Sequence, residues 1–196
     1  MSQIKITMLA IKLFMTSGLV VLIITMSACT ITNKYGPYYG KVVDKETKEP
    51  IEGAAVLFVF YTASFSVGGP VYHYADAIET TTNKNGEFRL AEHRIIATGI
   101  LQRWDEYENV TIFKPGYGCY PTHPDVEALG PGFPRDNSTI IELPQLKTKE
   151  ERLDMPSLNF DVPYDKQKNL VNLINQELKL FGATWSYTAE SFNSRH

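Results

Sequence analysis

The hydrophobic positions between residues 38 and 143 form short runs that fit β-strands. Residues 38–43 follow the alternating pattern of a strand with one solvated face. Residues 55–62 are apolar at both odd and even positions and rich in β-branched and aromatic side chains, which predicts a strand buried on both faces. Residues 77–82, 87–90, 109–114 and 139–143 are further β patterns. The middle of the chain is therefore expected to be mostly β.

Polar and glycine-rich segments separate these runs. Residues 45–50 are predicted to form a charged turn, and residues 66–70 a surface loop around Gly68 and Gly69. Asn85 and Gly86 can adopt positive φ, which predicts a hairpin between the strands 77–82 and 87–90. Residues 65–76 and 92–108 are interpreted as long loop insertions, and the proline-rich residues 116–135 as an irregular excursion.

The pattern changes after residue 146. From 165 to 181 the apolar residues recur at spacings of three and four, which predicts an amphipathic helix. Asp161 or Asp165 is the candidate N-cap, and Gly182 is the candidate residue after the C-cap. We expect this helix to pack on the β region as a C-terminal extension, 147–196.

The first 28 residues have the order of a secretory signal. Lys5 and Lys12 precede the uncharged residues 13–28, which are fewer than the roughly 20 apolar residues that span a bilayer. The segment Met26-Ser27-Ala28-Cys29 resembles the lipobox of bacterial lipoproteins. That resemblance implies cleavage before Cys29 and a lipid on its thiol. The alternative is an ordinary secretory signal or an uncleaved anchor, with Cys29 incidental.

Localisation and partners follow from this reading. A lipid on Cys29 places the protein at the cell envelope, and Thr30, rather than an aspartate, after the cysteine favours the outer membrane in enteric-type sorting. Removal of residues 1–28 takes away two lysines and no acidic residue, so the formal net charge moves from −3 to −5. We expect no nucleic-acid partner, because phosphate binding needs clustered basic residues.

Cys119 is the only cysteine left after lipidation of Cys29. No intramolecular disulfide can then form, so the fold must depend on its core. No basic cluster adjoins Cys119 to stabilise a thiolate, and a buried, inert thiol is expected.

Four segments carry a family resemblance. They are Gly40-Lys41-Val42-Val43-Asp44, Pro50-Ile51-Glu52-Gly53-Ala54, Thr82-Asn83-Lys84-Asn85-Gly86-Glu87-Phe88 and Val110-Thr111-Ile112-Phe113-Lys114-Pro115-Gly116-Tyr117. In this order they resemble carboxypeptidase regulatory-like domains, over residues 38–117 and the strand near 140. The resemblance implies a Greek-key, prealbumin-like β-sandwich. The predicted organisation is a signal peptide at 1–28, a tether at 29–37, the sandwich at 38–146 and the helical extension.

Sequence motifs for catalysis are missing. The chain has no Gly-x-Ser-x-Gly, His-Glu-x-x-His, phosphate-loop or dinucleotide motif, so we expect neither enzymatic activity nor a cofactor. The alternative is an envelope enzyme or metal-binding protein that uses the loop histidines His73, His93 and His123. A further alternative is a Lys–Asn amide formed by Lys41 or Lys114, as in some pilin-type sandwiches.

Aromatic residues gather around the tether and the two insertions. Tyr72, Tyr74, Trp104 and Tyr107 are the candidates for binding an envelope protein or a glycan, because exposed aromatic rings bind both. The alternative is that these rings cover the ends of the sandwich.

Overall fold

The structure is a computed structural model, and it describes residues 30–98, 102–105, 109–129, 139–153 and 155–193. It is mostly β, with helices only near the C-terminal end of this described part. The predicted signal peptide and Cys29 lie outside the described residues, as do Tyr107 and His196.

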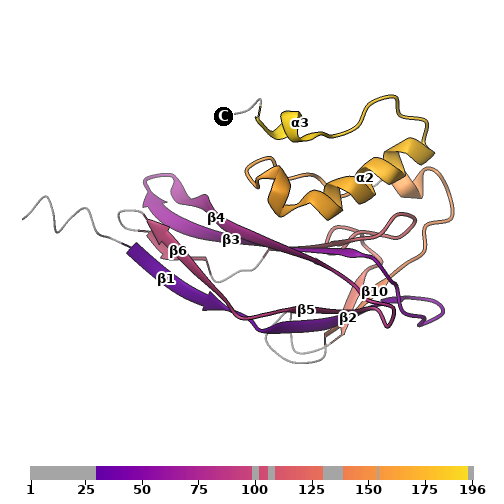
Figure 1. The fold of residues 1–196 in the computed structure, drawn as a ribbon, viewed down its shortest axis with the longest axis horizontal. Helices are drawn as coiled ribbons and strands as arrows, with labels where there is room; N and C mark the ends of the chain where they lie inside the picture. The colour runs from indigo at the N-terminus through magenta and orange to yellow at the C-terminus, as the bar shows by residue number, and fades with distance from the viewer. Residues whose placement is uncertain (1–29, 99–101, 106–108, 130–138, 154, 194–196) are drawn as a thin grey trace, which may run out of the picture.

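The lower sheet in Figure 1 contains four strands in the order β5-β2-β10-β9. Their bounds are β2 (Tyr38–Asp44), β5 (Glu87–Leu90), β9 (Glu127–Leu129) and β10 (Thr139–Leu143). Strands β2 and β10 run parallel, while β5 and β9 are antiparallel to their neighbours. The strands predicted at 38–43, 87–90 and 139–143 are therefore confirmed.

The second sheet is built around β3 (Ala55–Ser66). Its antiparallel partners are β4 (Gly69–Thr81) on one edge and, on the other, first β8 (Asn109–Phe113) and then β7 (Gln102–Trp104). A separate ribbon pairs β1 (Thr30–Tyr35) with β6 (His93–Thr98).

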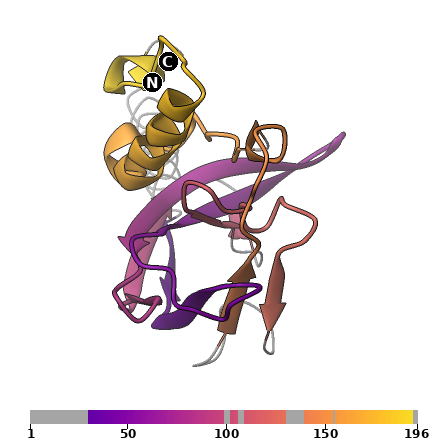
Figure 2. The same ribbon diagram turned by 90° about the vertical axis from the view of Figure 1, so that its right-hand side faces the viewer.

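Strand β3 is buried on both faces, as its sequence predicts. Val56, Phe58 and Phe60 face the other sheet and share one core with residues such as Val42 and Ile141. Side chains of the opposite parity, such as Leu57 and Val59, belong to a second cluster beneath the C-terminal helix. Figure 2 shows the resulting layers, with the helix above the long β3–β4 pair and the lower sheet beneath it.

The helix α2 spans Lys168–Leu180 and buries the predicted face of Leu170, Val171, Ile174 and Leu178. It follows two short 3-10 turns, η1 (Glu151–Leu153) and η2 (Tyr164–Lys166), and precedes α3 (Ala189–Asn193). Gly182 follows the C-cap with φ of +76°, as predicted. The C-terminal tail returns along α2, where Asn175 exchanges two hydrogen bonds with the backbone of Tyr187.

The predicted N-cap of α2 is wrong. Gln167 occupies that position without a side-chain capping bond, and its amide nitrogen donates to the carbonyls of Asn159 and Val162. The cap comes from β4, where the Glu79 carboxylate accepts the N–H groups of Asn169 and Leu170 at 2.8 and 2.6 Å. Burial raises the pKa of Glu79, and these two hydrogen bonds oppose the rise. A contact across about 90 positions of sequence cannot be read from the local pattern.

Two segments predicted as irregular are strands. The tether expected at 29–37 is β1 from Thr30 to Tyr35, because its β-branched residues find a pairing partner in β6. The surface loop expected at 66–70 is only the turn Val67-Gly68, since β3 and β4 continue through residues 65–76 as a hairpin. The other insertion, 92–108, supplies β6 and β7.

The hairpin expected around Asn85 and Gly86 is also wrong, although its turn forms. The Gly86 N–H donates to the Asn83 carbonyl, and the Asn83 N–H donates to the Glu87 carbonyl. The two strands then separate, since β4 stays with β3 and β5 pairs with β2. This connection between the sheets lets Phe88 and Leu90 enter the shared core.

Candidate functional site

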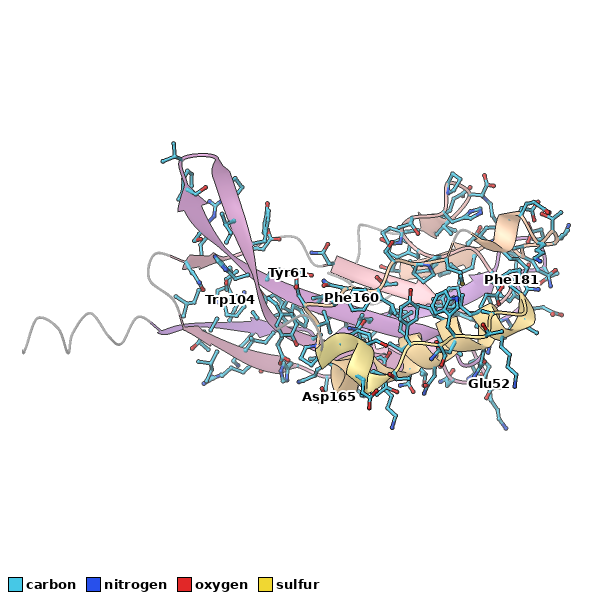
Figure 3. All side chains as sticks on the ribbon, turned by 90° about the horizontal axis from the view of Figure 1, so that it is seen from above. Glu52, Tyr61, Trp104, Phe160, Asp165 and Phe181 are labelled. Carbon is cyan, nitrogen blue, oxygen red and sulfur yellow. The ribbon has the colours of Figure 1, made fainter. Side chains whose placement is uncertain are left out.

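The outer part of the β3–β4 hairpin projects beyond the two-sheet body. Strand β8 covers β3 only from Ala55 to Val59, and the pairing of β3 with β4 shifts register between Phe60 and Tyr61. We call residues 61–74 the arm. Figure 3 shows it leaving the body on the side of Tyr61 and Trp104. At its end, Ser66 pairs with Gly69 around the two-residue turn.

Apolar side chains stand in solvent at the tip of the arm. Phe65 is 81% exposed and Val67 is fully exposed, while Val71 and Tyr72 are 43% and 55% exposed. No Asp, Glu, Lys or Arg occurs between Glu52 and Asp76 in the sequence. The tip is therefore an uncharged apolar projection, which is unusual for side chains left in water.

The base of the arm is held by polar contacts. The Thr62 hydroxyl donates to Gln102 of β7 at 3.0 Å, and the Ser64 hydroxyl lies 2.8 Å from Nε2 of His73. The guanidinium of Arg103 lies 5.9 Å from the centre of the Phe65 ring. These contacts fix the arm to β7 and leave the residues beyond Phe65 without a covering strand among the described residues.

The arm and the start of the described chain lie at the same end of the molecule (Figure 1). Thr30 pairs with Thr98 in the β1–β6 ribbon, and Ser64 pairs with Gln102 in the β3–β7 pair. Thr98 and Gln102 are four residues apart, so about 14 Å is the longest span of chain between them. With one strand spacing of about 5 Å on each side, Thr30 lies within about 25 Å of Ser64.

The predicted aromatic residues are divided between core and surface. Trp104 is half-buried and packs against the shared core, with its ring 5.7 Å from that of Tyr35, and Tyr74 belongs to the cluster beneath α2. Burial, reinforced by the Asp76 carboxylate, raises the pKa of the Tyr74 hydroxyl well above its usual value. Tyr72 alone among the three described candidates is largely exposed. It borders a hollow of about 390 Å³ with Tyr61, Asp105 and Asn109.

A polar cluster at the root of the arm was not predicted. The Asp76 carboxylate accepts from Lys166 of η2 at 2.9 Å and contacts Nε2 of His93 at 3.0 Å. Burial alone would raise the pKa of Asp76, but hydrogen bonds from Lys166, His93 and the Ala77 N–H outweigh it and lower the pKa. Asp76 thus connects β4, β6 and the helical layer. No local sequence signal joins these three elements.

The histidines do not converge. His73 contacts Ser64 and His93 contacts Asp76, while His123 accepts a hydrogen bond from the Asp125 N–H. Among the described residues, no group of three His, Cys, Asp or Glu side chains is arranged to hold a metal ion. The geometry therefore gives no support to the alternative of an envelope enzyme or metal site built on these histidines.

The three remaining candidates are Cys119 and the two lysines, Lys41 and Lys114. Cys119 is buried, as expected, with its thiol 3.4 Å from the Tyr120 carbonyl. The Lys114 ammonium donates to the Glu52 carbonyl at the surface, and Lys41 lines an open hollow of about 780 Å³ on the outer face of the lower sheet. Neither lysine is buried in the core, where the alternative of a Lys–Asn amide requires it.

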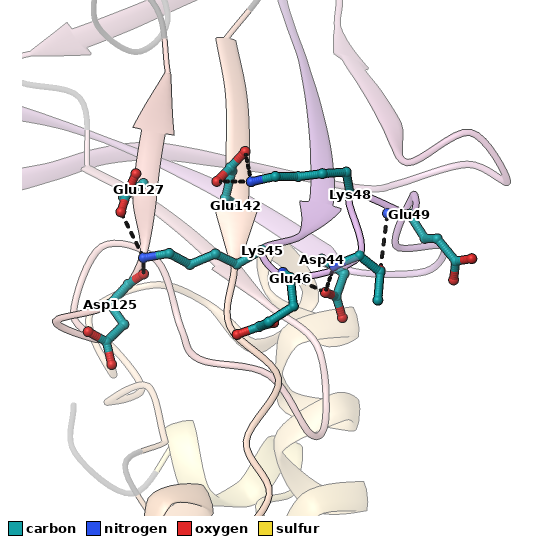
Figure 4. Close-up of polar contacts among 9 residues, drawn as sticks. Asp44, Lys45, Glu46, Lys48, Glu49, Asp125, Glu127 and Glu142 are labelled. Carbon is teal, nitrogen blue, oxygen red and sulfur yellow. Dashed lines mark hydrogen bonds and ion pairs between the residues drawn. The ribbon is translucent and has the colours of Figure 1, made fainter.

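The end of the molecule opposite the arm, where β2 and β10 end (Figure 1), carries the charged contacts drawn in Figure 4. The Lys45 ammonium binds Glu127 and the Asp125 carbonyl, each at 2.7 Å, and Lys48 binds both oxygens of Glu142 at 2.7 Å. Asp44 accepts the N–H groups of the following turn, which lowers its pKa against the effect of burial. The arm end of the molecule is therefore apolar, whereas the end formed by the turn after β2 and by β9 and β10 is charged.

Comparisons with known proteins add no relative: no family model, no curated protein and no solved structure matches this chain. Neither helix of the described part has the length and apolar character needed to cross a bilayer.

Proposed function

We propose that the protein is a lipid-anchored module of the cell envelope, attached through Cys29 and acting by binding or as a structural component rather than by catalysis. The observation that carries this proposal is the position of β1. Its first residue, Thr30, directly follows the proposed lipid-bearing cysteine and is paired with Thr98. A lipid on Cys29 would therefore hold the folded body at the bilayer without an intervening flexible linker.

The chemistry of Cys29 supports a stable attachment. A thioether to diacylglycerol, with acylation of the freed α-amino group, adds two or three acyl chains at one residue. Each buried CH₂ contributes about 0.8 kcal/mol, so one chain binds reversibly and two or more hold the protein on the membrane. Thr30 after the cysteine favours the outer membrane as the destination.

We place the binding function at the arm end of the molecule. Tyr72 presents an exposed ring beside the hollow that also includes Tyr61, Asp105 and Asn109. An aromatic ring next to polar groups suits a glycan or a protein segment of the envelope. Tyr74 packs in the cluster beneath α2 and Trp104 packs against the shared core, so both would support this end of the molecule through packing.

The body fits the proposed resemblance to carboxypeptidase regulatory-like sandwiches in its general features. It has two sheets over one core, a central strand buried on both faces, and tight turns at Gly53, Gly86 and Gly116, each with positive φ. Such domains serve as accessory modules, so the resemblance favours a role in attachment over one in chemistry.

Replacement of Cys29 by alanine tests the anchor. We expect the wild-type protein to incorporate labelled palmitate and to sediment with membranes, and the Cys29→Ala variant to lose the label and either leave the membrane fraction or accumulate as the precursor. Cys119→Ala is the matched control, because it removes the other cysteine and should keep the label. Normal processing and membrane attachment of Cys29→Ala would refute lipid anchoring.

A further inference from the structure

We propose that the tip of the arm is a second membrane contact, which inserts Phe65 and Val67 into the surface of the same bilayer that holds the lipid on Cys29. This inference rests on the proposed lipid anchor and goes beyond it. The anchor would attach the protein to the membrane, whereas the arm would set the orientation of the body relative to the membrane surface.

The first support is the character of the tip. Three apolar side chains, Phe65, Val67 and Val71, are exposed on the arm, with the exposed ring of Tyr72 beside them, and the arm carries no Asp, Glu, Lys or Arg. The helical layer and the lower sheet leave this part of the hairpin uncovered (Figures 1 and 3). Removal of these side chains from water is favourable in proportion to the apolar area that is buried.

The second support is the position of the tip relative to the anchor. The pairing of Thr30 with Thr98 and of Ser64 with Gln102 keeps Thr30 within about 25 Å of the arm. A lipid on the preceding residue would hold the bilayer surface within reach of the tip. Since the protein is already attached to the bilayer, insertion of the tip needs no second association from solution, so weak apolar contributions suffice to maintain the contact between tip and bilayer. Because the tip lies close to the proposed lipid attachment, we identify the partner that covers the tip as a lipid surface.

The third support is the order in which apolar, amphipathic and charged residues follow one another with distance from the tip. Tyr72 and Arg103 flank the apolar tip, and both residue types are suited to the headgroup region, since each combines an apolar stem or ring with a polar end. The charged cluster of Lys45, Lys48, Glu127 and Glu142 lies at the opposite end of the body, on the turn after β2 and on β9 and β10. The order from apolar tip to charged end matches the order from acyl chains to water.

The depth of insertion is limited by the backbone. Beyond Ser64, no strand among the described residues pairs with the free edge of β3, so its N–H and C=O groups need water or headgroups as partners. At the tip, the Ser66 hydroxyl donates to the Gly69 carbonyl at 2.7 Å and satisfies one such group. The arm is therefore built to enter the interface and the outermost acyl region only.

The test places an environment-sensitive fluorophore at the tip of the full-length, lipidated protein. Val67→Cys is labelled with a nitrobenzoxadiazole maleimide and reconstituted into vesicles of phosphatidylethanolamine and phosphatidylglycerol. Lys84→Cys is the matched control, because Lys84 is exposed in the turn at the other end of β4. Buried Cys119 should not react, which labelling of the unsubstituted protein checks. Palmitate incorporation is measured on the same samples.

We expect the label at position 67 to shift its emission to shorter wavelength and to lose intensity with nitroxide-bearing lipids, while the label at position 84 does neither. Phe65→Asp in the Val67→Cys protein should reduce both effects at unchanged palmitate incorporation. Equal behaviour of the two labels in a palmitoylated protein would overturn the membrane-contact proposal and leave the anchor standing. Absence of palmitate would instead refute the anchor, and the tip proposal with it. A shift without lipid quenching, accompanied by crosslinking of position 67 to a second copy or another protein, would overturn the membrane contact in favour of a protein interface.

Discussion

Replacement of Arg152 by alanine should destabilise the junction between the body and its C-terminal layer. The Arg152 guanidinium donates through Nε and Nη2 to the two carboxylate oxygens of Glu177 on α2, at 2.7 and 2.9 Å. This hydrogen bonding raises the pKa of Arg152 further, so the pair stays charged on the arginine side at all pH values of interest. The Glu177 side chain is only 2% exposed, whereas that of Arg152 is 26% exposed.

The expected cost follows from what the substitution leaves behind. Removal of one partner from a buried ion pair costs about 3–5 kcal/mol, because the remaining charge is desolvated and unpaired. Arg152 is partly exposed, so water can reach the space it vacates, and we expect a loss somewhat below that range, about 2–3 kcal/mol. The contact between Arg152 and the Phe181 ring, with 5.7 Å to the ring centre, adds about 0.5 kcal/mol.

Urea unfolding followed by tryptophan fluorescence measures this cost, and Arg152→Lys and the double replacement of Arg152 and Glu177 by methionine are the controls. Lysine keeps the charge but not the two parallel hydrogen bonds, so it should lose about 1 kcal/mol. The double variant should lie within about 1 kcal/mol of wild type, because no unpaired charge remains. A loss of less than about 0.5 kcal/mol for Arg152→Ala would refute the reasoning that Glu177 depends on this partner.

Three further substitutions test other parts of the fold. Gly86→Ala should lower the free energy of unfolding by about 2–3 kcal/mol in urea titrations, because φ is +73° and a Cβ would lie 2.3 Å from the Val42 carbonyl oxygen. Gly68→Ala is the control and should be near neutral, because its Cβ would meet only a side-chain oxygen at 3.9 Å. Glu79→Ala should cost about 1–2 kcal/mol by removing the cap of α2, with a loss of helical circular dichroism before global unfolding; an unchanged melting curve would show that the cap contributes nothing. The pKa of Asp76 is lower in the folded state than its ordinary value of 3.8, so its contribution to stability is present above that pH and is lost as the pH falls through the folded value. Asp76→Asn should therefore flatten the acid side of a plot of melting temperature against pH, and a parallel curve would contradict this assignment.

The local patterns of the sequence predict the body better than the arm. Strand β3 was predicted with two buried faces because its apolar residues occupy both parities, and the face of α2 followed from spacings of three and four. Both signals lie within the element itself. The strand character of β1 cannot be read locally because its partner, β6, lies far along the chain. The outer half of the hairpin pairs within itself, and Gly68, Gly69 and Pro70 give it the local pattern of a loop.

The candidate site, like the fold, is predicted by the sequence only in part. The aromatic residues around the insertions predict a binding surface at the arm end of the molecule, and of these residues Tyr72 is exposed. Sequence alone did not separate Tyr72 from Trp104, which packs against the core, because burial depends on the ring of Tyr35 and the path of β7. The local signal for the arm is the absence of charged side chains from residues 53–75, a stretch that is long for an exposed loop and fits a hairpin with an uncharged tip.

The length of strand β3 sets the distance between the tip of the arm and the charged end of the body. The 12 residues of β3 extend from the tip of the arm, through the register shift at Phe60 and Tyr61, to the far end of the body, about 40 Å at 3.3 Å per residue. With the tip resting on a bilayer, the charged turns at the other end would stand up to about 40 Å above it. The hairpin would then serve as a spacer of defined height, and anything bound at the far end would be presented at that distance from the membrane.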